Sequence, residues 1–290
     1  MDSNQKDLIS QGGLVMVVQH NMQAVNANRM LGGNVKAVAK NTEKLSSGYK
    51  VNRAADDAAG LSISEKMRNQ IRGINQAVSN AEDGQYLIQT AEGNMNEIHS
   101  ILQRMGELAT KAANDVNATE DRQSITDEMT QLTEEIDSIA NKAQFNGTYL
   151  LNGNMAASKA KYLQVGANYG ENMKISIAKM TASGIGIKAS TVKVMTHAQA
   201  ASAMKVITAA IKSVSAARSK LGAIQNRLDY TINNLNNYSE NLTSAESNIR
   251  DTDMATEMVN YSKNNILQQA AQSMLAQANQ SNQGVLSLLQ

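Results

Sequence analysis

Few side chains in this sequence are of the types that catalyse reactions or bind metals, and they are scattered along the chain. The three histidines, His20, His99 and His197, lie far apart, with no carboxylate at metal-ligand spacing and no His-Glu-x-x-His run. Gly184 and Gly186 enclose a single isoleucine, and the further glycine of a phosphate-binding loop is missing. We therefore expect no metal site, no nucleotide site and no cofactor.

Acidic residues are the other candidates for chemistry, because paired carboxylates can act as general acid and base. Glu134 and Glu135 are adjacent, and Asp251 closely precedes Asp253. Basic residues accompany both pairs, which is typical of a solvated helix face. The chain also lacks cysteine, so it has no thiolate nucleophile, no thiolate metal site and no disulfide. We expect no catalytic residue, and the chain is not predicted to be an enzyme.

The balance of charge disfavours polyanionic partners. The 290 residues include 27 basic and 26 acidic side chains, for a net charge of +1. No excess positive charge is available to release counterions from nucleic acid or to attract anionic lipid. No apolar run is long enough for a membrane span, and the first residues lack the basic and apolar segments of a signal peptide. We predict no nucleic-acid partner, no membrane partner and no cleaved signal peptide.

The composition instead favours long helices. Proline is absent, and aromatic residues make up only 3% of a chain that is 42% apolar. Proline inside a helix removes a hydrogen-bond donor and clashes with the preceding turn, at about 3 kcal/mol, so long helices exclude it. Alanine, leucine, isoleucine, valine and the 16 methionines suit the packing of helix on helix.

Apolar residues recur at alternating spacings of three and four, as on a helix that packs along one face. The longest such stripe runs from Ile207 to Ile249, with one polar position at Thr231. Two others cover residues 67–116 and 125–143, and we expect the second to fold back antiparallel on the first. The spacing predicts a mainly α fold, a bundle of long coiled-coil helices.

Each end of the chain carries a narrower stripe. The predicted packing residues are Val18, Met22, Val25, Leu31, Val35 and Val38 near the N-terminus and Leu267, Ala271, Met274, Ala278, Val285 and Leu288 near the C-terminus. Neither helix has enough apolar width to be stable alone. We expect the two terminal helices to pair with each other or with other copies. Residues 1–15 show no stripe, and we expect an extension or tag before a natural start at Met16.

Residues 146–195 differ from the rest of the sequence. Asn-Gly turns begin at Asn146 and Asn152, and an alternation of apolar residues follows. The alternating residues are Leu163, Val165, Met173, Ile175 and Ile177. We predict a small β-hairpin subdomain here, with its turn at residues 167–171.

The segment from Leu45 to Ile63, Leu-Ser-Ser-Gly-Tyr-Lys-Val-Asn-Arg-Ala-Ala-Asp-Asp-Ala-Ala-Gly-Leu-Ser-Ile, closely resembles the signature of bacterial flagellins. The C-terminal part resembles the other conserved end of that family. Its matching segments begin at Leu221, Asn241, Ala255, Ile266, Leu275 and Val285. Together the resemblance covers nearly everything from Met16 onward.

The resemblance implies a division of the chain that periodicity alone does not give. Residues 16–50 and 252–290 would form an inner coiled-coil domain, and residues 51–251 an outer-core helical domain that includes the β-hairpin region. The large, variable outer domains of longer flagellins would be missing. Arg53, Asp56 and Asp57 fall in the connecting spoke, where the resemblance implies charge contacts to neighbouring subunits. A polar linker is the alternative.

The resemblance also implies partners. They are other copies of the chain in a helical filament, an export chaperone on the C-terminal helix, hook-associated and cap proteins, and Toll-like receptor 5. The implied receptor-binding residues are Leu102, Gln103, Arg104, Glu107 and Glu128. Gly106 and Leu132 depart from the family pattern, since receptor-activating relatives commonly carry arginine there. A plain solvent-exposed face is the alternative.

The function that we expect is that of a structural subunit of the bacterial flagellar filament. Such a subunit would be exported unfolded through the flagellar type III system and would lie outside the cell. A hook-filament junction protein is one alternative, although such proteins usually depart from the signature between Arg53 and Gly60. A soluble coiled-coil binding module is the other alternative, because it would also carry long heptads and little net charge.

Overall fold

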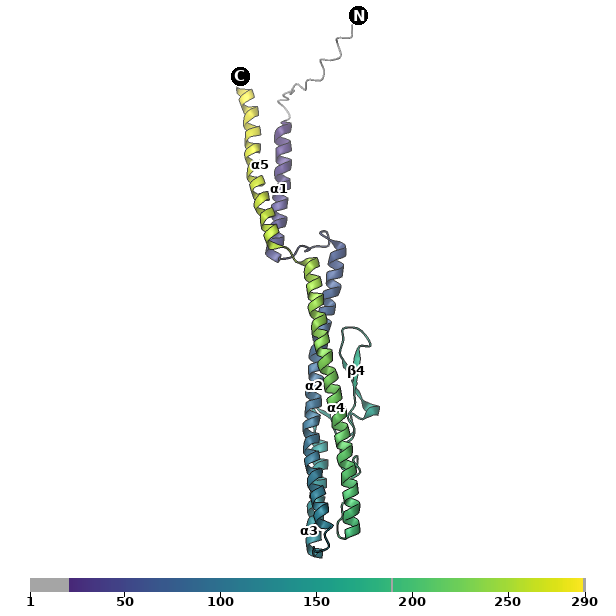
Figure 1. Ribbon diagram of the computed structural model, residues 1–290. Coiled ribbons are helices and arrows are strands. Elements are labelled where there is room, and N and C mark those ends of the chain that lie inside the picture. The colour runs from purple at the N-terminus through teal and green to yellow at the C-terminus, as the bar shows by residue number, and fades with distance from the viewer. Residues whose placement is uncertain (1–20, 189, 289–290) are drawn as a thin grey trace. The chain divides into compact units, whose positions relative to one another are not determined.

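The computed structural model describes residues 21–188 and 190–288, with side chains up to residue 281 (Figure 1). Its long helices are α1 (Met22–Ser47), α2 (Ala58–Ala112), α3 (Thr119–Lys142), α4 (His197–Arg250) and α5 (Met254–Leu288). A short hairpin region lies between α3 and α4. The predicted fold class, a mainly α bundle with a small β-hairpin, is confirmed. None of the described helices could cross a membrane.

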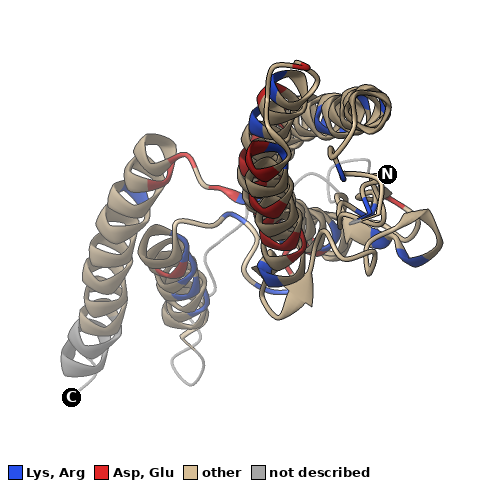
Figure 2. Cartoon of the chain, turned by 90° about the horizontal axis from the view of Figure 1, so that it is seen from below, with Lys and Arg blue, Asp and Glu red and all other residues tan. Residues whose placement is uncertain are grey.

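The chain divides into two compact units, which we describe separately. The terminal unit contains residues 1–65 and 245–290, and the central unit contains residues 66–244. Residues 1–15, which we expected to be an extension or tag, lie outside the described residues. Both signs of charge occur along the helices (Figure 2), although α3 is predominantly acidic.

The central unit is built around one core of aliphatic and methionine side chains. Residues of α2 enter it at alternating spacings of three and four, so that a single stripe faces α3, α4 and the hairpin region. The largest fully buried side chains that α2 and α3 contribute to this core are Ile88, Met95, Ile98, Leu102, Met105, Met129 and Ile136. A smaller cluster of Ile74, Ala77 and Leu235 joins α2 to α4 elsewhere in the unit. The stripe predicted in α4 is buried where expected, at Ile207, Val214, Leu221 and Leu228.

The non-helical region contains two hairpins. Strands β1 (Gln144–Phe145) and β2 (Thr148–Tyr149) are joined by a two-residue turn in which Asn146 and Gly147 have φ of 45° and 71°. Positive φ at both positions is the reason that this turn type prefers Asn-Gly. Strands β3 (Lys161–Gln164) and β4 (Asn172–Ile175) pair antiparallel, and Leu163 lies opposite Met173. A short 3-10 helix, η1 (Ala157–Lys159), precedes them.

The second hairpin lies close against α2 at Gly73. A Cβ atom built on Gly73 would come within 2.9 Å of the Ala167 Cβ and 3.3 Å of its Cα, in the loop between β3 and β4. Glycine is therefore required for the loop to approach the helix this closely. Gly93, also on α2, is different, because a Cβ there would meet no atom within 4 Å.

These two glycines give a matched test of the packing. Gly93→Ala should raise the free energy of unfolding by about 0.5–1 kcal/mol, because alanine loses less backbone entropy in a helix. Gly73→Ala should lower it, because the hairpin loop must move away from α2. Urea denaturation followed by circular dichroism measures both changes. Equal stabilisation by the two substitutions would show that the loop does not pack on α2.

Candidate functional site

The described residues contain no group of three or more side chains that could hold a metal ion. His99 lies on α2, where its Nε2 is 3.2 Å from Nε2 of Gln103, and His197 is the first residue of α4. His20 lies outside the described residues. The features that remain as candidates for function are surfaces, and three of them include residues that the sequence singled out.

The first candidate is the helix pair of the terminal unit, in which α1 and α5 pack against each other. The pair is antiparallel, because Asn21 near the start of α1 donates to the carbonyl of Ala278 (2.9 Å), whereas Lys44 near its end lies 3.7 Å from Glu257. The less exposed positions of α1 recur at spacings of three and four and form the seam: Ala24, Ala27, Leu31, Asn34, Val38, Asn41 and Leu45. Those of α5 are Glu257, Tyr261, Asn264, Gln268, Ala271, Leu275 and Ala278.

The seam is small and polar for a helix pair. Alanine and amide side chains occupy many of its positions, and leucine or valine only a few. Asn41 is buried, and its amide nitrogen has no hydrogen-bond partner. A buried amide without a partner destabilises the folded state. The α1–α5 pair is therefore held by a narrow contact that buries little apolar surface.

Of the predicted packing residues, Leu31, Val38, Ala271 and Ala278 lie in the seam. Met22, Val25, Val35, Leu267 and Met274 do not pack between the two helices of one chain, because their side chains are exposed, and their packing on other copies stays a prediction. Apolar spacing identifies the faces of a helix but not the partner of each face. Val18 lies outside the described residues, and the structure does not describe the side chains of Val285 and Leu288.

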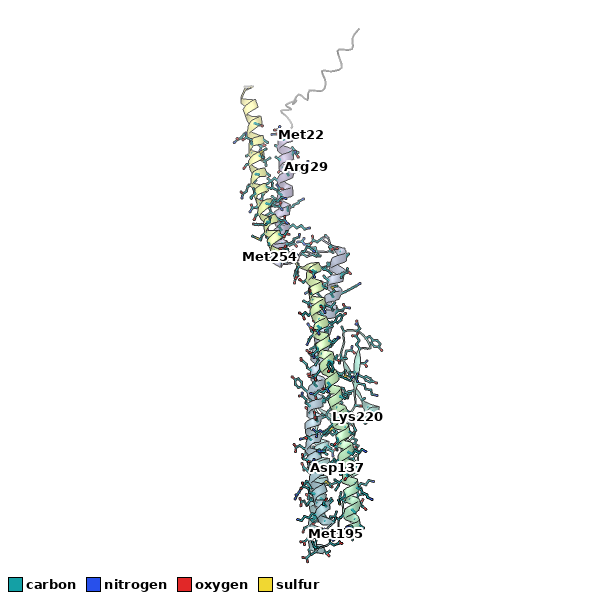
Figure 3. All side chains as sticks on the ribbon, in the orientation of Figure 1. Met22, Arg29, Asp137, Met195, Lys220 and Met254 are labelled. Atoms are coloured by element: carbon teal, nitrogen blue, oxygen red, sulfur yellow. The ribbon has the colours of Figure 1, made fainter. Side chains whose placement is uncertain are left out.

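Bulky apolar side chains instead lie on the outside of the pair, and we call this set the outer apolar face. On α1 it consists of Met22, Val25, Met30 and Val35, and on α5 of Met254, Met258, Val259, Ile266, Leu267 and Met274. Met22 and Met254 lie at opposite ends of the pair (Figure 3). An open groove of about 530 Å³ runs between the helices, with Met30 and Met274 in its lining. Exposed apolar surface of this extent is typical of an interaction site.

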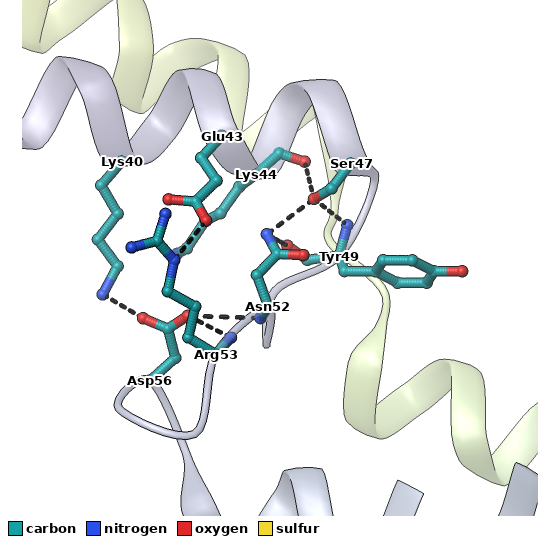
Figure 4. A network of polar contacts seen from close by, with 8 residues as sticks. All are labelled: Lys40, Glu43, Lys44, Ser47, Tyr49, Asn52, Arg53 and Asp56. Carbon is teal, nitrogen blue, oxygen red and sulfur yellow. Dashed lines mark hydrogen bonds and ion pairs between the residues drawn. The ribbon is translucent and has the colours of Figure 1, made fainter. Parts of the chain in front are cut away.

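The second candidate is the spoke, residues 48–57, which leads from α1 to α2 (Figure 4). Asp56 accepts hydrogen bonds from the Lys40 ammonium (2.7 Å) and from the backbone N–H of Arg53 (3.2 Å). The guanidinium of Arg53 contacts the carboxylate of Glu43 at 2.9 Å. Asp57 accepts from the N–H of Gly60 (2.9 Å), as a helix N-cap does. The three predicted spoke residues thus all have partners within their own chain.

The hydrogen bond from Lys40, followed by that from Arg53, lowers the pKa of Asp56 below its ordinary value. The same Asp56 contact raises the pKa of Lys40. Both shifts favour the charged forms of the two groups. The ion pair therefore persists at neutral pH and fastens the spoke to α1.

Sequence reasoning missed a contact between the spoke and the segment that connects α4 to α5. Lys50 donates to the carbonyl of Arg250 (2.7 Å), and Thr252 donates to that of Gly48 (2.9 Å). The Arg250 guanidinium lies 4.6 Å from the centre of the Tyr49 ring, a cation–π contact. These bonds make a short antiparallel bridge. Nothing in the local sequence could indicate it, because its two sides are about 200 residues apart.

The third candidate is a charge cluster on α2 and α3. The Arg104 guanidinium lies 3.1 Å from the Glu128 carboxylate on α3 and 3.2 Å from that of Glu107 on α2. These contacts, with Glu128 first, raise the pKa of Arg104 above its ordinary value. Gln103 is also exposed. Leu102 is fully buried in the core, so its assignment as a surface contact is wrong: it continues the stripe that packs the inside of α2.

Comparison with known proteins gives matches along most of the chain. Residues 18–156 match the family model of the bacterial flagellin N-terminal helical region, and residues 204–289 match that of the bacterial flagellin C-terminal helical region. A flagellin of Halalkalibacterium halodurans is 51% identical over 274 residues, which cover 94% of this chain and 100% of that protein. The flagellar filament 31.3 kDa core protein of Treponema maltophilum is 46% identical, with 95% and 100% covered.

A solved structure from Vibrio parahaemolyticus, assigned as a flagellar hook-associated protein, superposes with a TM-score of 0.58. The match covers 68% of this chain and 100% of that one, at 16% identity. At such low identity the likeness shows a common fold alone.

The Lys40–Asp56 contact can be tested by hydrogen exchange. Because the pKa of Asp56 is lowered in the folded state, its contacts stabilise the spoke above the ordinary pKa of aspartate, and that stabilisation is lost as the pH falls through the lowered pKa. Asp56→Asn should therefore speed amide exchange in residues 48–57 at about pH 7, and wild type should approach the variant as the pH falls well below the ordinary pKa of aspartate. Asp83→Asn, on an exposed part of α2, is the control. Unchanged exchange at neutral pH in Asp56→Asn would contradict the role of this ion pair.

Proposed function

This chain belongs to the bacterial flagellin family, and from that premise we propose that α1 and α5 assemble the flagellar filament through their outer apolar face. The chain is a structural filament subunit and not an enzyme. The inner coiled-coil domain that we propose, residues 16–50 and 252–290, falls within the terminal unit. The proposed outer-core domain, residues 51–251, includes the whole central unit with its hairpin region.

The contrast between the seam and the outer apolar face carries the proposal. Within one chain, α1 and α5 contact each other mainly through alanines and amides, with only three leucines and one valine in the seam. All of their methionines are exposed, as are Val25, Val35, Val259, Ile266 and Leu267. Burial of one such bulky side chain is worth about 1.5–3 kcal/mol. A second copy of the chain offers the same narrow, elongated face, so repeated stacking of terminal units buries what a single subunit cannot.

The two alternative functions are less well supported. A soluble coiled-coil module would have no need for apolar side chains along the outside of its terminal helices. A hook-filament junction protein would share the helices, but the relatives that match 94% and 95% of the chain carry the names flagellin and flagellar filament core protein. The structure of the hook-associated type agrees in fold alone.

Our proposal includes export of the subunit as an unfolded chain through the flagellar type III system, to a place outside the cell. The lack of cysteine supports this route, because no disulfide has to be broken or formed. The exposed apolar residues of α5 support a chaperone contact before export, since they need a cover in the unassembled subunit. Hook-associated and cap proteins would contact the same helices at the ends of a filament.

A second proposed contact is recognition by Toll-like receptor 5, centred on Arg104. Glu107 and Glu128 hold its guanidinium in place on the surface of the central unit. Arginine in a fixed position is a frequent hot spot in protein interfaces, because less side-chain entropy is lost on binding. Gln103, the neighbour of Arg104 in the sequence, is also exposed, whereas the side chain of Leu102 is buried in the core beneath this part of α2.

The assembly proposal predicts a difference between two exposed valines. Val259 on α5 is 69% exposed, and Val116 in the loop between α2 and α3 is 83% exposed. Val259→Gln should raise the critical concentration for polymerisation about tenfold or more, because a polar side chain replaces an apolar one in the interface. Val116→Gln should leave it unchanged.

Sedimentation and electron microscopy measure the polymer, and circular dichroism of the monomer checks that both valine variants fold. If Val259→Gln polymerises as well as wild type does, α5 does not supply the assembly face.

The receptor proposal predicts a loss of affinity for the receptor ectodomain. Arg104→Ala should weaken binding by about tenfold or more, and Arg104→Lys should recover only part of it, because lysine cannot make the paired contacts of the guanidinium. Surface plasmon resonance with the purified ectodomain gives the affinities. Lys142→Ala, at the far end of α3, is the control. Equal affinities for wild type and Arg104→Ala would exclude this site.

A further inference from the structure

The methionines of the described chain are divided sharply between the two units. Those of the central unit are buried or half-buried, and Met95, Met105, Met129 and Met155 have 0% exposure. Those of α1 and α5 are all exposed, by between 48% and 70%: Met22, Met30, Met254, Met258 and Met274. The thioethers that solvent can reach are therefore concentrated on the outer apolar face.

The composition makes these sulfur atoms the preferred targets of an oxidant. The chain contains no cysteine and no tryptophan, so methionine is its most readily oxidised side chain. A peroxide reacts with the thioether by transfer of one oxygen: the sulfur loses two electrons and forms an S=O bond, the O–O bond breaks, and the second oxygen leaves as water. Reactivity follows exposure, which separates the terminal methionines from the buried ones.

We propose that the exposed methionines of α1 and α5 are modification sites through which peroxides control assembly: their conversion to sulfoxides in the free subunit prevents polymerisation. The inference rests on the proposed assembly through the outer apolar face. It adds a covalent modification of that face, the oxidation of methionine, and names peroxides as the class of oxidant.

The physical reason for the block is the polarity of the product. A sulfoxide oxygen is a strong hydrogen-bond acceptor, and burial in an apolar contact leaves it without a partner. Met30 and Met274 line the groove between the helices, while Met254 and Met258 lie on the first turns of α5, so oxidation changes the face along its length (Figure 3). In an assembled filament the same residues are covered by other copies, so the filament resists an oxidant that inactivates the free subunit.

Leucine provides the matched substitution, because it is similar to methionine in size and apolar character but has no sulfur. The test variant carries leucine at all five exposed positions, Met22, Met30, Met254, Met258 and Met274. The control variant carries leucine at three buried positions, Met95, Met105 and Met129. Each full-length protein is treated with hydrogen peroxide as a monomer, and peptide mass spectrometry then locates every sulfoxide.

In wild type we expect sulfoxides on the five exposed methionines before any appear on the buried ones. The critical concentration for polymerisation should rise about tenfold or more, equivalent to one unpaired polar group in the interface. The five-leucine variant should polymerise equally well before and after treatment, whereas the buried-position control should lose assembly as wild type does. Preformed wild-type filaments should acquire fewer sulfoxides at these positions.

A second measurement does not depend on how the variants fold. Treatment of oxidised wild type with methionine sulfoxide reductases and dithiothreitol should restore polymerisation, because the sulfoxides are reduced back to thioethers. Failure of untreated wild type to polymerise would overturn the proposed function itself. Normal polymerisation by a subunit that carries all five sulfoxides would overturn only the oxidation switch and leave the assembly face intact.

Discussion

The narrow contact between α1 and α5 is the constraint on which the rest of the molecule depends. Alanine lets two helices approach closely but contributes little apolar area, and Asn41 brings an unpartnered amide into the seam. The central unit is the opposite case, with isoleucine, leucine and methionine closed into a continuous core. One chain therefore combines a self-sufficient body with a marginal helix pair. Most of the bulky apolar side chains of that pair point outward, so in the assembly that we propose its stability comes from other copies.

The free energy available from burying the outer apolar face can be compared with the cost of association. Full burial of an exposed bulky side chain is worth about 1.5–3 kcal/mol, and those of α1 and α5 are between 42% and 70% exposed, so together they represent roughly 9–17 kcal/mol of apolar burial that the single chain does not use. Association of two proteins loses about 4–15 kcal/mol of translational and rotational freedom. The outer apolar face is therefore large enough to offset this loss when it is shared among neighbours. A single subunit cannot obtain the same gain, because each helix of the pair can turn only one of its sides toward the other helix.

Much of this organisation could be predicted from the sequence, and the errors have a common cause. The stripe in α4 was correct at Leu221 and Leu228, and the Asn146 turn forms because its residues tolerate positive φ. Met22 and Leu267 are exposed in the single chain, because apolar spacing does not say whether the other terminal helix or another copy covers a given face. Leu102 followed family resemblance, although its place in the buried stripe of α2 marks it as a core residue. Arg104, Glu107 and Glu128 were named from the family resemblance, but their contacts across α2 and α3 could not be predicted from heptad spacing, because that spacing does not align one helix along another.

The bridge at Tyr49 has a mechanical consequence. Two backbone segments of the terminal unit lie antiparallel there and are joined by hydrogen bonds from Lys50 to Arg250 and from Thr252 to Gly48. A twisting load passed along the chain is therefore divided between two covalent strands, whose cross-links resist sliding past each other. Arg250 stabilises the bridge further, because its guanidinium lies over the Tyr49 ring and also contacts the carboxylate of Glu65. Such a cross-linked joint resists unravelling of the helix ends on either side of it.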